Sequence, residues 1–434
     1  MTLREIALKL LLDYEDSGKY VNLSLNSHLA DKLSREERGQ LTALLYTTVE
    51  RKITLDYIIG ALAGRSVDRL SVHTLAVLRL GICQLLYMES IPDFAAVNET
   101  VKLAKNQGER SLVNGVLRTA VRRRDELPMP DKAKNAARYY SVTYSLPLAT
   151  VRHFMNALGE DESVKLFESF NHEPPLTVTV NTLKISVDDF LKNLEKSGYV
   201  ATRAKFSPIS VRISGNINPK NLPGFDEGHF LVQDEASAIA ASLHTKSRVI
   251  VDVCSAPGGK AMTAAILTGD SVEIYAFDLH SSKLSLIDGS ASRLGIASVT
   301  VAQRDATTPV PTLLGRADSV ICDVPCSGLG VIAKKPDLRY KPIENISELN
   351  ALQSRILTCS AEYLRVGGTL VYSTCTLNKA ENEDIVRDFL EKNPEFSTVP
   401  IDLFGEQGTS GMITLYPHIH ETDGFFIAVL KKTK

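Results

Sequence analysis

Residues 249–260 read VIVDVCSAPGGK, and this stretch decides the fold of the C-terminal half of the chain. Its first five residues form an apolar run, which is typical of a strand buried on both faces of a parallel sheet. The small residues and two glycines that follow predict a turn whose backbone amides can approach a ligand. A helix that begins after such a turn favours an anionic group, such as a carboxylate, at its N-terminus. We therefore expect a strand, a ligand-binding turn and a helix.

The same alternation continues along the rest of the chain. Further short apolar runs stand at 272–277, 299–301, 319–322 and 368–372, separated by helical patterns. This order predicts an α/β domain over residues 236–434, with a doubly wound, Rossmann-like parallel sheet. Ligands of this architecture bind at the carboxyl ends of the strands, so the residues that directly follow each run are candidates for the site.

The N-terminal half has a different pattern. Through residues 1–130, apolar residues recur at the three-four spacing of one helix face, which predicts an all-α bundle. The segment Leu127-Pro-Met-Pro-Asp131 cannot continue a helix and marks a boundary. Residues 131–235 mix helical runs with the strand-like segment Leu176–Thr182, which predicts an α+β middle domain. We expect three domains, over 1–130, 131–235 and 236–434.

Size and charge narrow the class of protein. With 434 residues the chain is longer than a single core supports. A net charge of -2 gives no global attraction to a polyanion, so nucleic-acid contacts must come from local basic patches. No apolar run approaches the roughly 20 residues of a membrane span, and the first residues lack a signal peptide's apolar core. We expect a cytoplasmic protein with no membrane partner.

The cysteines indicate thiols rather than disulfides or a metal site. Their scatter through a long chain is not a disulfide framework. The close pair Cys322 and Cys326 lacks the second Cys/His pair of a zinc site, so we expect no metal. The six are Cys83, Cys254, Cys322, Cys326, Cys359 and Cys375.

The glycine-rich turn excludes two common nucleotide motifs. A nucleotide-triphosphate loop would have a glycine in place of Cys254 and Ser or Thr in place of Ala261, and the dinucleotide Gly-x-Gly-x-x-Gly pattern is absent. Asp278 ends the second run about 20 residues later, where a carboxylate can accept both hydroxyls of an adenosyl ribose. Asp305 follows the third run, within reach of an adenine edge. A single Asp at a strand end is usually a helix cap. Here Asp278, Asp305 and Asp323 stand at three successive strand ends, which favours a ligand-binding role.

Two cysteines, Cys326 and Cys375, leave predicted strands at this same edge. Carbon 5 of cytosine accepts a methyl group only after a thiolate adds at carbon 6 and pushes electron density onto carbon 5. Asp323, three residues before Cys326, is placed to hydrogen-bond or protonate ring nitrogen 3. A second cysteine can assist release of the product. These residues alone do not rank the two thiols, and a lone cysteine is more often a small buried hydrophobe.

Candidate RNA contacts lie outside this edge. The helical stretch Leu112–Arg124 ends in a cluster of arginines that either grip phosphates or offset the helix dipole, with both interpretations open. Asn181, at the end of a predicted strand, either contacts a nucleotide or forms a turn, the commoner role. The arginines are Arg118, Arg122, Arg123 and Arg124.

Three blocks of the sequence resemble the signature blocks of the RNA 5-methylcytosine methyltransferases. They are Cys254–Lys260, Asp323-Val-Pro-Cys-Ser-Gly328 with Lys335-Pro-Asp337, and Tyr372-Ser-Thr-Cys375 with Glu381-Asn-Glu383, and Asp423-Gly-Phe-Phe426 resembles the family's last strand. The helical domain is similar to the RNA-binding bundle NusB. This pairing, over nearly the whole chain, resembles the small-subunit ribosomal RNA branch, the RsmB/Sun family. It implies S-adenosylmethionine as cofactor, 16S ribosomal RNA as partner and no obligate protein partner.

The resemblance also implies roles for single residues. It makes Cys375 the nucleophile, Cys326 the group that assists product release, and Lys335 a contact to RNA. Thr179 stands where the family usually has Arg, which puts one RNA contact in doubt, and Ala261 replaces a usual Thr. The implied cofactor-binding residues are Cys254, Ser255, Ala256, Pro257, Gly258, Gly259, Lys260, Asp278, Asp305 and Asp323.

Three other functions share part of these sequence features. A DNA cytosine-5 methyltransferase would use the Pro-Cys cysteine as nucleophile, and the Thr-Cys block and NusB-like domain argue against it. A transfer RNA cytosine-5 methyltransferase would keep the mechanism and change only the substrate. A non-catalytic, antitermination-like RNA-binding factor is disfavoured by the intact set of Asp323, Cys326 and Cys375.

Overall fold

The computed structural model describes residues 1–17, 33–215, 217–244, 247–343, 346–403, 406–408 and 410–434. The chain forms two compact units, and each is described here by itself. The first comprises Met1–Asn171 with Lys335–Ile343, and the second comprises His172–Lys334 with Glu344–Lys434. None of the described helices is long and apolar enough to cross a membrane.

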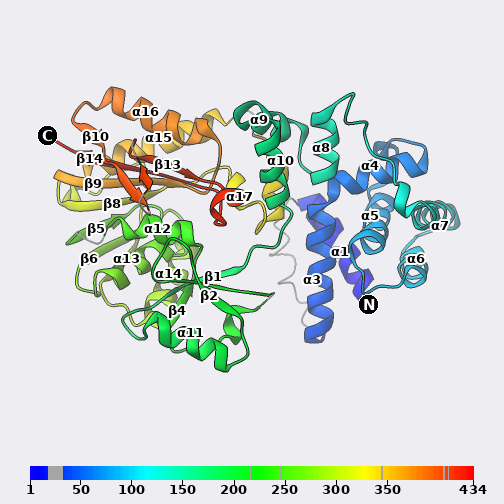
Figure 1. Ribbon diagram of the computed structural model, residues 1–434, viewed down its shortest axis with the longest axis horizontal. Coiled ribbons are helices and arrows are strands. Elements are labelled where there is room, and N and C mark those ends of the chain that lie inside the picture. Colours follow the sequence, from blue (N-terminus) through cyan, green and yellow to red (C-terminus); the bar gives the residue numbers. More distant parts are fainter. Residues whose placement is uncertain (18–32, 216, 245–246, 344–345, 404–405, 409) are drawn as a thin grey trace. The chain divides into compact units, whose positions relative to one another are not determined.

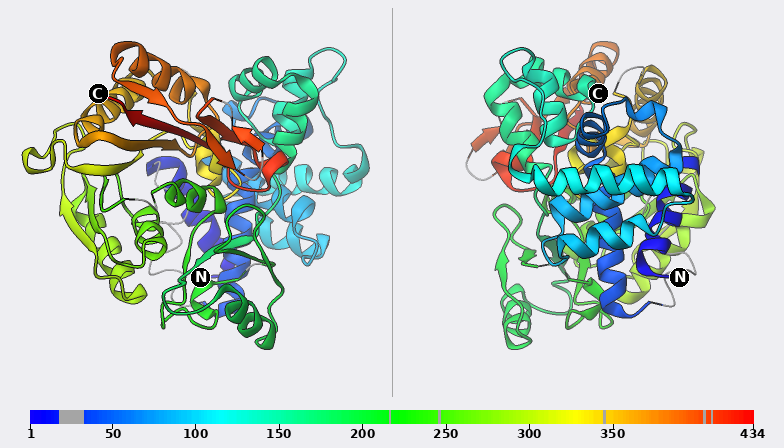
Figure 2. Two further views of the ribbon diagram at one scale, coloured as in Figure 1. Left: turned by 60° about the vertical axis from the view of Figure 1, so that its left-hand side comes forward. Right: turned by 90° about the vertical axis from the view of Figure 1, so that its right-hand side faces the viewer.

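The first unit is helical (Figures 1 and 2), as expected for residues 1–130, and it also takes in residues 131–171 from the segment that was predicted as the α+β middle domain. Its helices begin at good caps: Ser34 forms a capping box with Glu37, and Ser71 accepts a hydrogen bond from the amide of Thr74. Their apolar faces meet in one core that includes Leu11, Leu44 and Leu80. The helices are α1 (Leu3–Ser17), α3 (Arg35–Glu50), α4 (Lys52–Ala63), α5 (Val72–Tyr87), α6 (Asp93–Val101), α7 (Gln107–Arg122), α8 (Ala136–Tyr144), α9 (Leu148–Leu158) and α10 (Glu160–Ser169).

A segment from late in the sequence completes this unit. Within Lys335–Ile343, the short helix η7 (Pro336–Tyr340) carries Arg339, whose side chain is fully buried. The Arg339 guanidinium donates to the carbonyl of Phe170 at 2.8 Å and to Asn171 Oδ1 at 2.7 Å. A buried guanidinium requires such acceptors, so this segment is an integral part of the helical unit.

The second unit begins with a small antiparallel sheet of order β2-β3-β1-β4. Its strands are β1 (Leu176–Val180), β2 (Ala201–Arg203), β3 (Ser210–Ile213) and β4 (Phe230–Val232). Helix α11 (Val187–Lys196) buries Val187, Phe190 and Leu194, which recur at helical spacing, in the same core as the strand residue Val178. This arrangement is the α+β architecture expected for the middle of the chain.

The larger sheet of this unit has the strand order β10-β14-β9-β8-β5-β6-β7, with β13 paired to β14. The pairs among β5 to β9 are parallel, whereas β14 and its neighbours are antiparallel. The expected parallel sheet is thus confirmed for its central strands, and the sheet as a whole is mixed because β14 runs antiparallel to both of its neighbours, β9 and β10. The strands are β5 (Val249–Asp252), β6 (Glu273–Asp278), β7 (Val299–Gln303), β8 (Ala317–Asp323), β9 (Leu364–Thr374), β10 (Phe396–Thr398), β13 (Met412–Leu415) and β14 (Phe425–Lys432).

Helices cover both faces of this sheet (Figures 1 and 2). Along β5, Ile250 packs in the core that contains α13 (Gly259–Leu267) and α14 (Ser281–Leu294), and Val251 packs in the core that contains α15 (Ser347–Glu362) and α16 (Glu383–Lys392). Because successive strand residues point to opposite faces and both faces are covered, Val249, Ile250 and Val251 are all apolar, and the strand ends at Asp252. This explains the continuous apolar run by which the strand was predicted.

Candidate active site

The turn after β5 is held by the end of the neighbouring strand. The Ser255 amide donates to the carbonyl of Phe277 at 2.7 Å, and the Ala256 amide donates to Asp278 Oδ2 at 3.2 Å. Gly258 has a φ of 99°, and a Cβ there would lie 3.1 Å from Ile287 Cγ2. Glycine at this position therefore permits both the left-handed turn and the close packing of α14.

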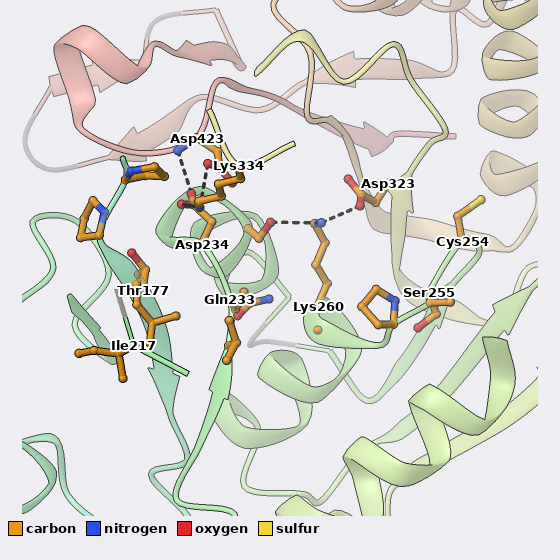
Figure 3. A pocket seen from close by; sticks show the side chains of 18 of the residues that line it. Thr177, Ile217, Gln233, Asp234, Cys254, Ser255, Lys260, Asp323, Lys334 and Asp423 are labelled. Carbon is orange, nitrogen blue, oxygen red and sulfur yellow. Dashed lines mark hydrogen bonds and ion pairs between the residues drawn. The ribbon is translucent and has the colours of Figure 1, made fainter. Parts of the chain in front are cut away.

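A pocket of about 440 Å³ opens over this turn (Figure 3). The expected cofactor residues Cys254, Ser255, Ala256, Pro257, Gly259, Lys260 and Asp323 line it. Its other walls come from the middle of the chain, including Thr177, Ile217 and Gln233. The pocket thus joins the cofactor turn to the small sheet.

Asp252, the last residue of β5, is a buried carboxylate in the wall of this pocket. It is 1% exposed, and within the described part of the chain neither carboxylate oxygen has a hydrogen-bond partner. Burial raises its pKa to about 7 and outweighs weaker interactions with Ser255, the Lys260 ammonium and the Cys254 amide, which lower it. A buried, unsatisfied carboxylate costs free energy unless a partner arrives, and the natural partner is a cationic or hydrogen-bond-donating ligand.

Lys260 and Asp323 form an ion pair on the opposite side of the turn. Lys260 Nζ donates to Asp323 Oδ2 at 2.7 Å, and Ser373 Oγ donates to Asp323 Oδ1 at 2.7 Å. Burial alone would lower the pKa of Lys260, but the charge and hydrogen bond of Asp323 outweigh it and the pKa is raised. Lys260 therefore stays an ammonium, and it also interacts electrostatically with Cys375.

The two cysteines meet beside this pair. Cys326 Sγ lies 3.3 Å from Cys375 Sγ, although 49 residues separate them in the sequence. The contact follows from the topology, because β8 and β9 are adjacent parallel strands and each cysteine follows one of them. The pKa of Cys326 is raised well above its ordinary value, first by the hydrogen bond with Cys375 and then by burial.

Close backbone packing joins the two cysteine loops. The Gly330 amide donates to the carbonyl of Cys375 at 3.0 Å, and the Gly424 amide donates to the carbonyl of Gly330 at 2.9 Å. A Cβ on Gly330 would lie 1.8 Å from the Gly424 carbonyl oxygen, so a side chain at this position would force the loops apart.

Lys334 lines the pocket and was not foreseen as a site residue. It forms ion pairs with Asp234 at 2.7 Å and Asp423 at 2.8 Å (Figure 3). Burial lowers its pKa, but the two carboxylates raise it further, so the charge persists. Its exposed neighbour Lys335, which was expected to contact RNA, does not line the pocket. Nothing in the sequence distinguishes Lys334, which lines the pocket, from the adjacent Lys335, which is exposed.

Two more pocket residues, Asp252 and Gln233, were missed from the sequence. Gln233 Oε1 accepts from Thr263 Oγ1 at 2.6 Å and from Thr179 Oγ1 at 2.9 Å. Thr179, the position where Arg is usual in the family, is thus buried as a support for Gln233. Asp252 could have been noticed in the sequence, because it is an acidic residue within the apolar run 249–253. No sequence pattern marks Gln233 as a pocket residue.

Asp278 and Asp305 lie outside the pocket-lining set. Asp278 is buried, and its second oxygen accepts from the His280 amide at 3.0 Å. Asp305 is exposed, and the side-chain and backbone hydrogen bonds of Thr307 lower its pKa. Both carboxylates follow strands at the same edge as the turn, as expected.

The predicted RNA contacts fall into two groups. The four arginines are exposed at the end of α7 and just beyond it, and Arg124 is partly engaged by an ion pair with Asp93 at 2.6 Å. Asn181 is fully buried, and its amide donates to the carbonyls of Gly228 and Leu294 at 3.0 and 2.9 Å. This geometry favours the turn-forming interpretation of Asn181.

The described residues contain no group of three or more His, Cys, Asp or Glu side chains that could hold a metal ion.

Comparison with known proteins identifies the family. Three family models match: "16S rRNA methyltransferase RsmB/F" over residues 239–431, "NusB family" over 1–122, and the RsmF/B-like ferredoxin-like domain over 147–219. The chain is 35% identical to the probable ribosomal RNA small subunit methyltransferase B of Synechocystis, with 99% of each chain covered. The chain belongs to the RsmB/F family of 16S rRNA methyltransferases. The corresponding protein of Bacillus subtilis is 33% identical, again with 99% of each covered.

Solved structures support the RsmB/F assignment. The crystal structure of PH0851 superposes with a TM-score of 0.80 at 27% identity and covers 100% of this chain and 99% of that one. NSun6 from Pyrococcus horikoshii, solved with the S-adenosylmethionine analogue SFG, has a TM-score of 0.58 at 25% identity, with 65% and 97% covered. The expected S-adenosylmethionine-dependent methyltransferase fold is confirmed, together with the NusB and ferredoxin-like domains.

Proposed function

We propose that this RsmB/F protein methylates carbon 5 of a cytosine in 16S ribosomal RNA, in the cytoplasm, through a covalent adduct between Cys375 and carbon 6. The observation that carries the proposal is the contact of two thiols, 3.3 Å apart, beside the buried pair of Lys260 and Asp323. Methylation of an oxygen or an exocyclic nitrogen requires no thiol nucleophile, whereas carbon 5 does.

The pocket suits the cofactor. S-adenosylmethionine carries an ammonium group, and the unpartnered carboxylate of Asp252 in the pocket wall is the group of this chain that would hold it. The turn Cys254–Gly259 would lie against it, with Asp278 and Asp305 at the neighbouring strand ends toward the ribose and the adenine. When bound, S-adenosylmethionine supplies an electrophilic methyl group on its sulfonium.

Cys375 and Asp323 have separate roles in the proposed reaction. The Cys375 thiolate forms a bond to carbon 6, and the electron pair of the carbon 5–carbon 6 double bond moves to carbon 5, which takes the methyl group. Asp323, fixed by Lys260 and Ser373, would donate a hydrogen bond to nitrogen 3 in its protonated form, because that ring nitrogen is an acceptor. Loss of the carbon 5 proton to water returns the electron pair to the ring and breaks the bond to Cys375.

The pKa of Cys326 supports its assignment to product release. A thiol whose pKa is raised keeps its proton at neutral pH and is a poor nucleophile. At 3.3 Å it can instead donate a hydrogen bond to the departing Cys375 sulfur. Cys375, which interacts with the Lys260 ammonium, is the better candidate for the attacking thiolate.

The two cysteines are tested by serine variants, which preserve the volume of each side chain. Cys375→Ser should abolish methylation, whereas Cys326→Ser should leave a covalent RNA–protein adduct visible on a denaturing gel. The assay uses 16S ribosomal RNA, radiolabelled S-adenosylmethionine and nuclease digestion to identify the labelled base. Methylation retained in Cys375→Ser, or label on a base other than cytosine, would refute the mechanism.

The substrate is tested in the same assay with transfer RNA and single-stranded DNA as competitors. Exclusive labelling of transfer RNA would support the same reaction mechanism but show that transfer RNA, and not 16S ribosomal RNA, is the substrate. Label on DNA would support the alternative that the protein is a DNA cytosine-5 methyltransferase with Cys326 as the nucleophile. Absence of label with intact cofactor binding would favour a non-catalytic RNA-binding role.

A further inference from the structure

A fully buried carboxylate, Glu381, lies at the end of the short helix η8 (Lys379–Glu381) and is hydrogen-bonded to Ser327, the residue after Cys326. Its Oε2 accepts from the Ser327 amide at 2.8 Å and from Gln353 Nε2 at 3.1 Å. Its Oε1 accepts from Ser327 Oγ at 2.6 Å and from Asn378 Nδ2 at 3.2 Å. All four donors are neutral, so the charge is held by hydrogen bonds alone.

These bonds connect the two cysteine loops. Ser327 directly follows Cys326, and Glu381 lies six residues after Cys375. The Ser327 hydroxyl also lies 2.7 Å from Thr376 Oγ1, next to the second cysteine. Glu381 therefore secures the loop of one thiol to the segment that follows the other.

The pattern requires a carboxylate in particular. Each oxygen of Glu381 receives two donors, and a carboxylate accepts without donating. Glutamine has the same shape, but in either orientation its amide would direct an N–H at a nitrogen donor: Asn378 Nδ2 on one side, or the Ser327 amide and Gln353 Nε2 on the other. Only the Ser327 hydroxyl can reverse its role, because it can donate to Thr376 Oγ1 instead. The position therefore discriminates between two isosteric side chains.

We propose that Glu381 is a positioning residue for product release, which holds the Cys326 thiol against Cys375 so that the thiol can assist the departure of the Cys375 sulfur. This inference rests on the proposed covalent mechanism. Its negative charge also contributes to the raised pKa of Cys326, after the hydrogen bond with Cys375 and burial. Glu381 thereby favours both the location and the protonated form of the thiol.

The test is single-turnover kinetics of the full-length Glu381→Gln variant with 16S ribosomal RNA. We expect adduct formation within about threefold of wild type, and product release slowed at least about tenfold, so that the adduct accumulates. That fold-change corresponds to about 1.4 kcal/mol on one step. A purely structural role would instead lower both rates together.

Asp384→Asn is the matched control, because Asp384 lies three residues further on, is exposed and forms ion pairs of 4.0 Å with Lys379 and Arg387. Should Glu381→Gln fail to fold, Ser327→Ala removes one hydroxyl donor and keeps the backbone amide, and we expect a smaller delay in release of the same kind. Release at the wild-type rate, or parallel loss of both steps, would overturn the role of Glu381.

Cys326→Ser is run beside these variants to separate the two hypotheses. If it accumulates the adduct and neither Glu381→Gln nor Ser327→Ala does, the positioning role alone fails. If Cys326→Ser forms no adduct, the covalent mechanism fails and the positioning role falls with it.

Discussion

Two buried carboxylates of the same unit, Asp252 and Glu381, have opposite environments. Glu381 accepts four hydrogen bonds, whereas Asp252 accepts none within the described part of the chain. The folded chain itself supplies all the donors of Glu381, so this residue holds the loop of Cys326 in place. Asp252 remains unsatisfied in the pocket wall, which is the condition expected of a group that binds a ligand. Burial by itself thus does not separate structural from functional acids, but hydrogen bonding does.

The largest expected effect comes from removing the satisfied carboxylate. Glu381→Ala should lower the free energy of unfolding by about 4 kcal/mol, because it leaves three buried N–H donors without their acceptor, while the Ser327 hydroxyl keeps Thr376 Oγ1 as a partner. Urea denaturation monitored by circular dichroism measures this. A loss below about 1 kcal/mol would show that water replaces the carboxylate, and the contrast with Asp252 would disappear.

The unsatisfied carboxylate should behave in the opposite way. The pKa of Asp252 is about 7 in the folded protein, against 3.8 ordinarily. Between these values the folded state retains a proton that the unfolded state has lost, so stability falls as the pH rises from about 4 to about 7. Above pH 7 the ionised carboxylate costs up to about 4 kcal/mol, an upper bound from the shift in pKa.

Asp252→Asn removes this titration. In the absence of cofactor, the variant's stability relative to wild type should rise across that pH range, measured by urea denaturation at pH 5 and pH 8. Its affinity for S-adenosylmethionine should fall about tenfold or more at pH 8, measured by calorimetry, because a charged partner is lost. Unchanged affinity would mean that Asp252 does not hold the cofactor's ammonium.

The smallest effect is expected for an exposed acid on the same segment as Glu381. Asp384→Ala should change the free energy of unfolding by less than about 0.5 kcal/mol, because its ion pairs are exposed and long. A larger loss would show that the segment after Cys375 is sensitive to any substitution, and the specific role of Glu381 would be weakened.

Much of the fold was predictable from local pattern. The strand β5 was predicted within one residue, because both of its faces are covered and its positions before Asp252 are all apolar. Strand β9 extends further than its prediction, from Leu364 to Thr374, because Leu364 pairs with β8, Ser373 pairs with β8 and β14, and Thr374 pairs with β14, with a register shift between Leu364 and Thr369. Sheet pairing supplies hydrogen bonds wherever a partner backbone is present, whatever the side chain.

The site was predictable where chemistry is tied to a strand end. Cys254 to Lys260, Asp323 and the two cysteines all follow strands of one parallel sheet, so a common edge was expected and is observed. Lys334 and Gln233 escaped prediction because they come from a loop and from the small sheet, and their partners are remote in the sequence.

The sequence by itself determined the three kinds of architecture, the cofactor turn and the set of reactive side chains, because apolar periodicity and glycine-rich turns are local properties of a chain. Only the tertiary structure decided that Cys326 and Cys375 touch, that Asp323 is fixed between Lys260 and Ser373, and that Glu381 is satisfied while Asp252 is not. These facts depend on which strands become neighbours and on which donors reach each buried oxygen. Such contacts join residues tens of positions apart, and no local pattern specifies them.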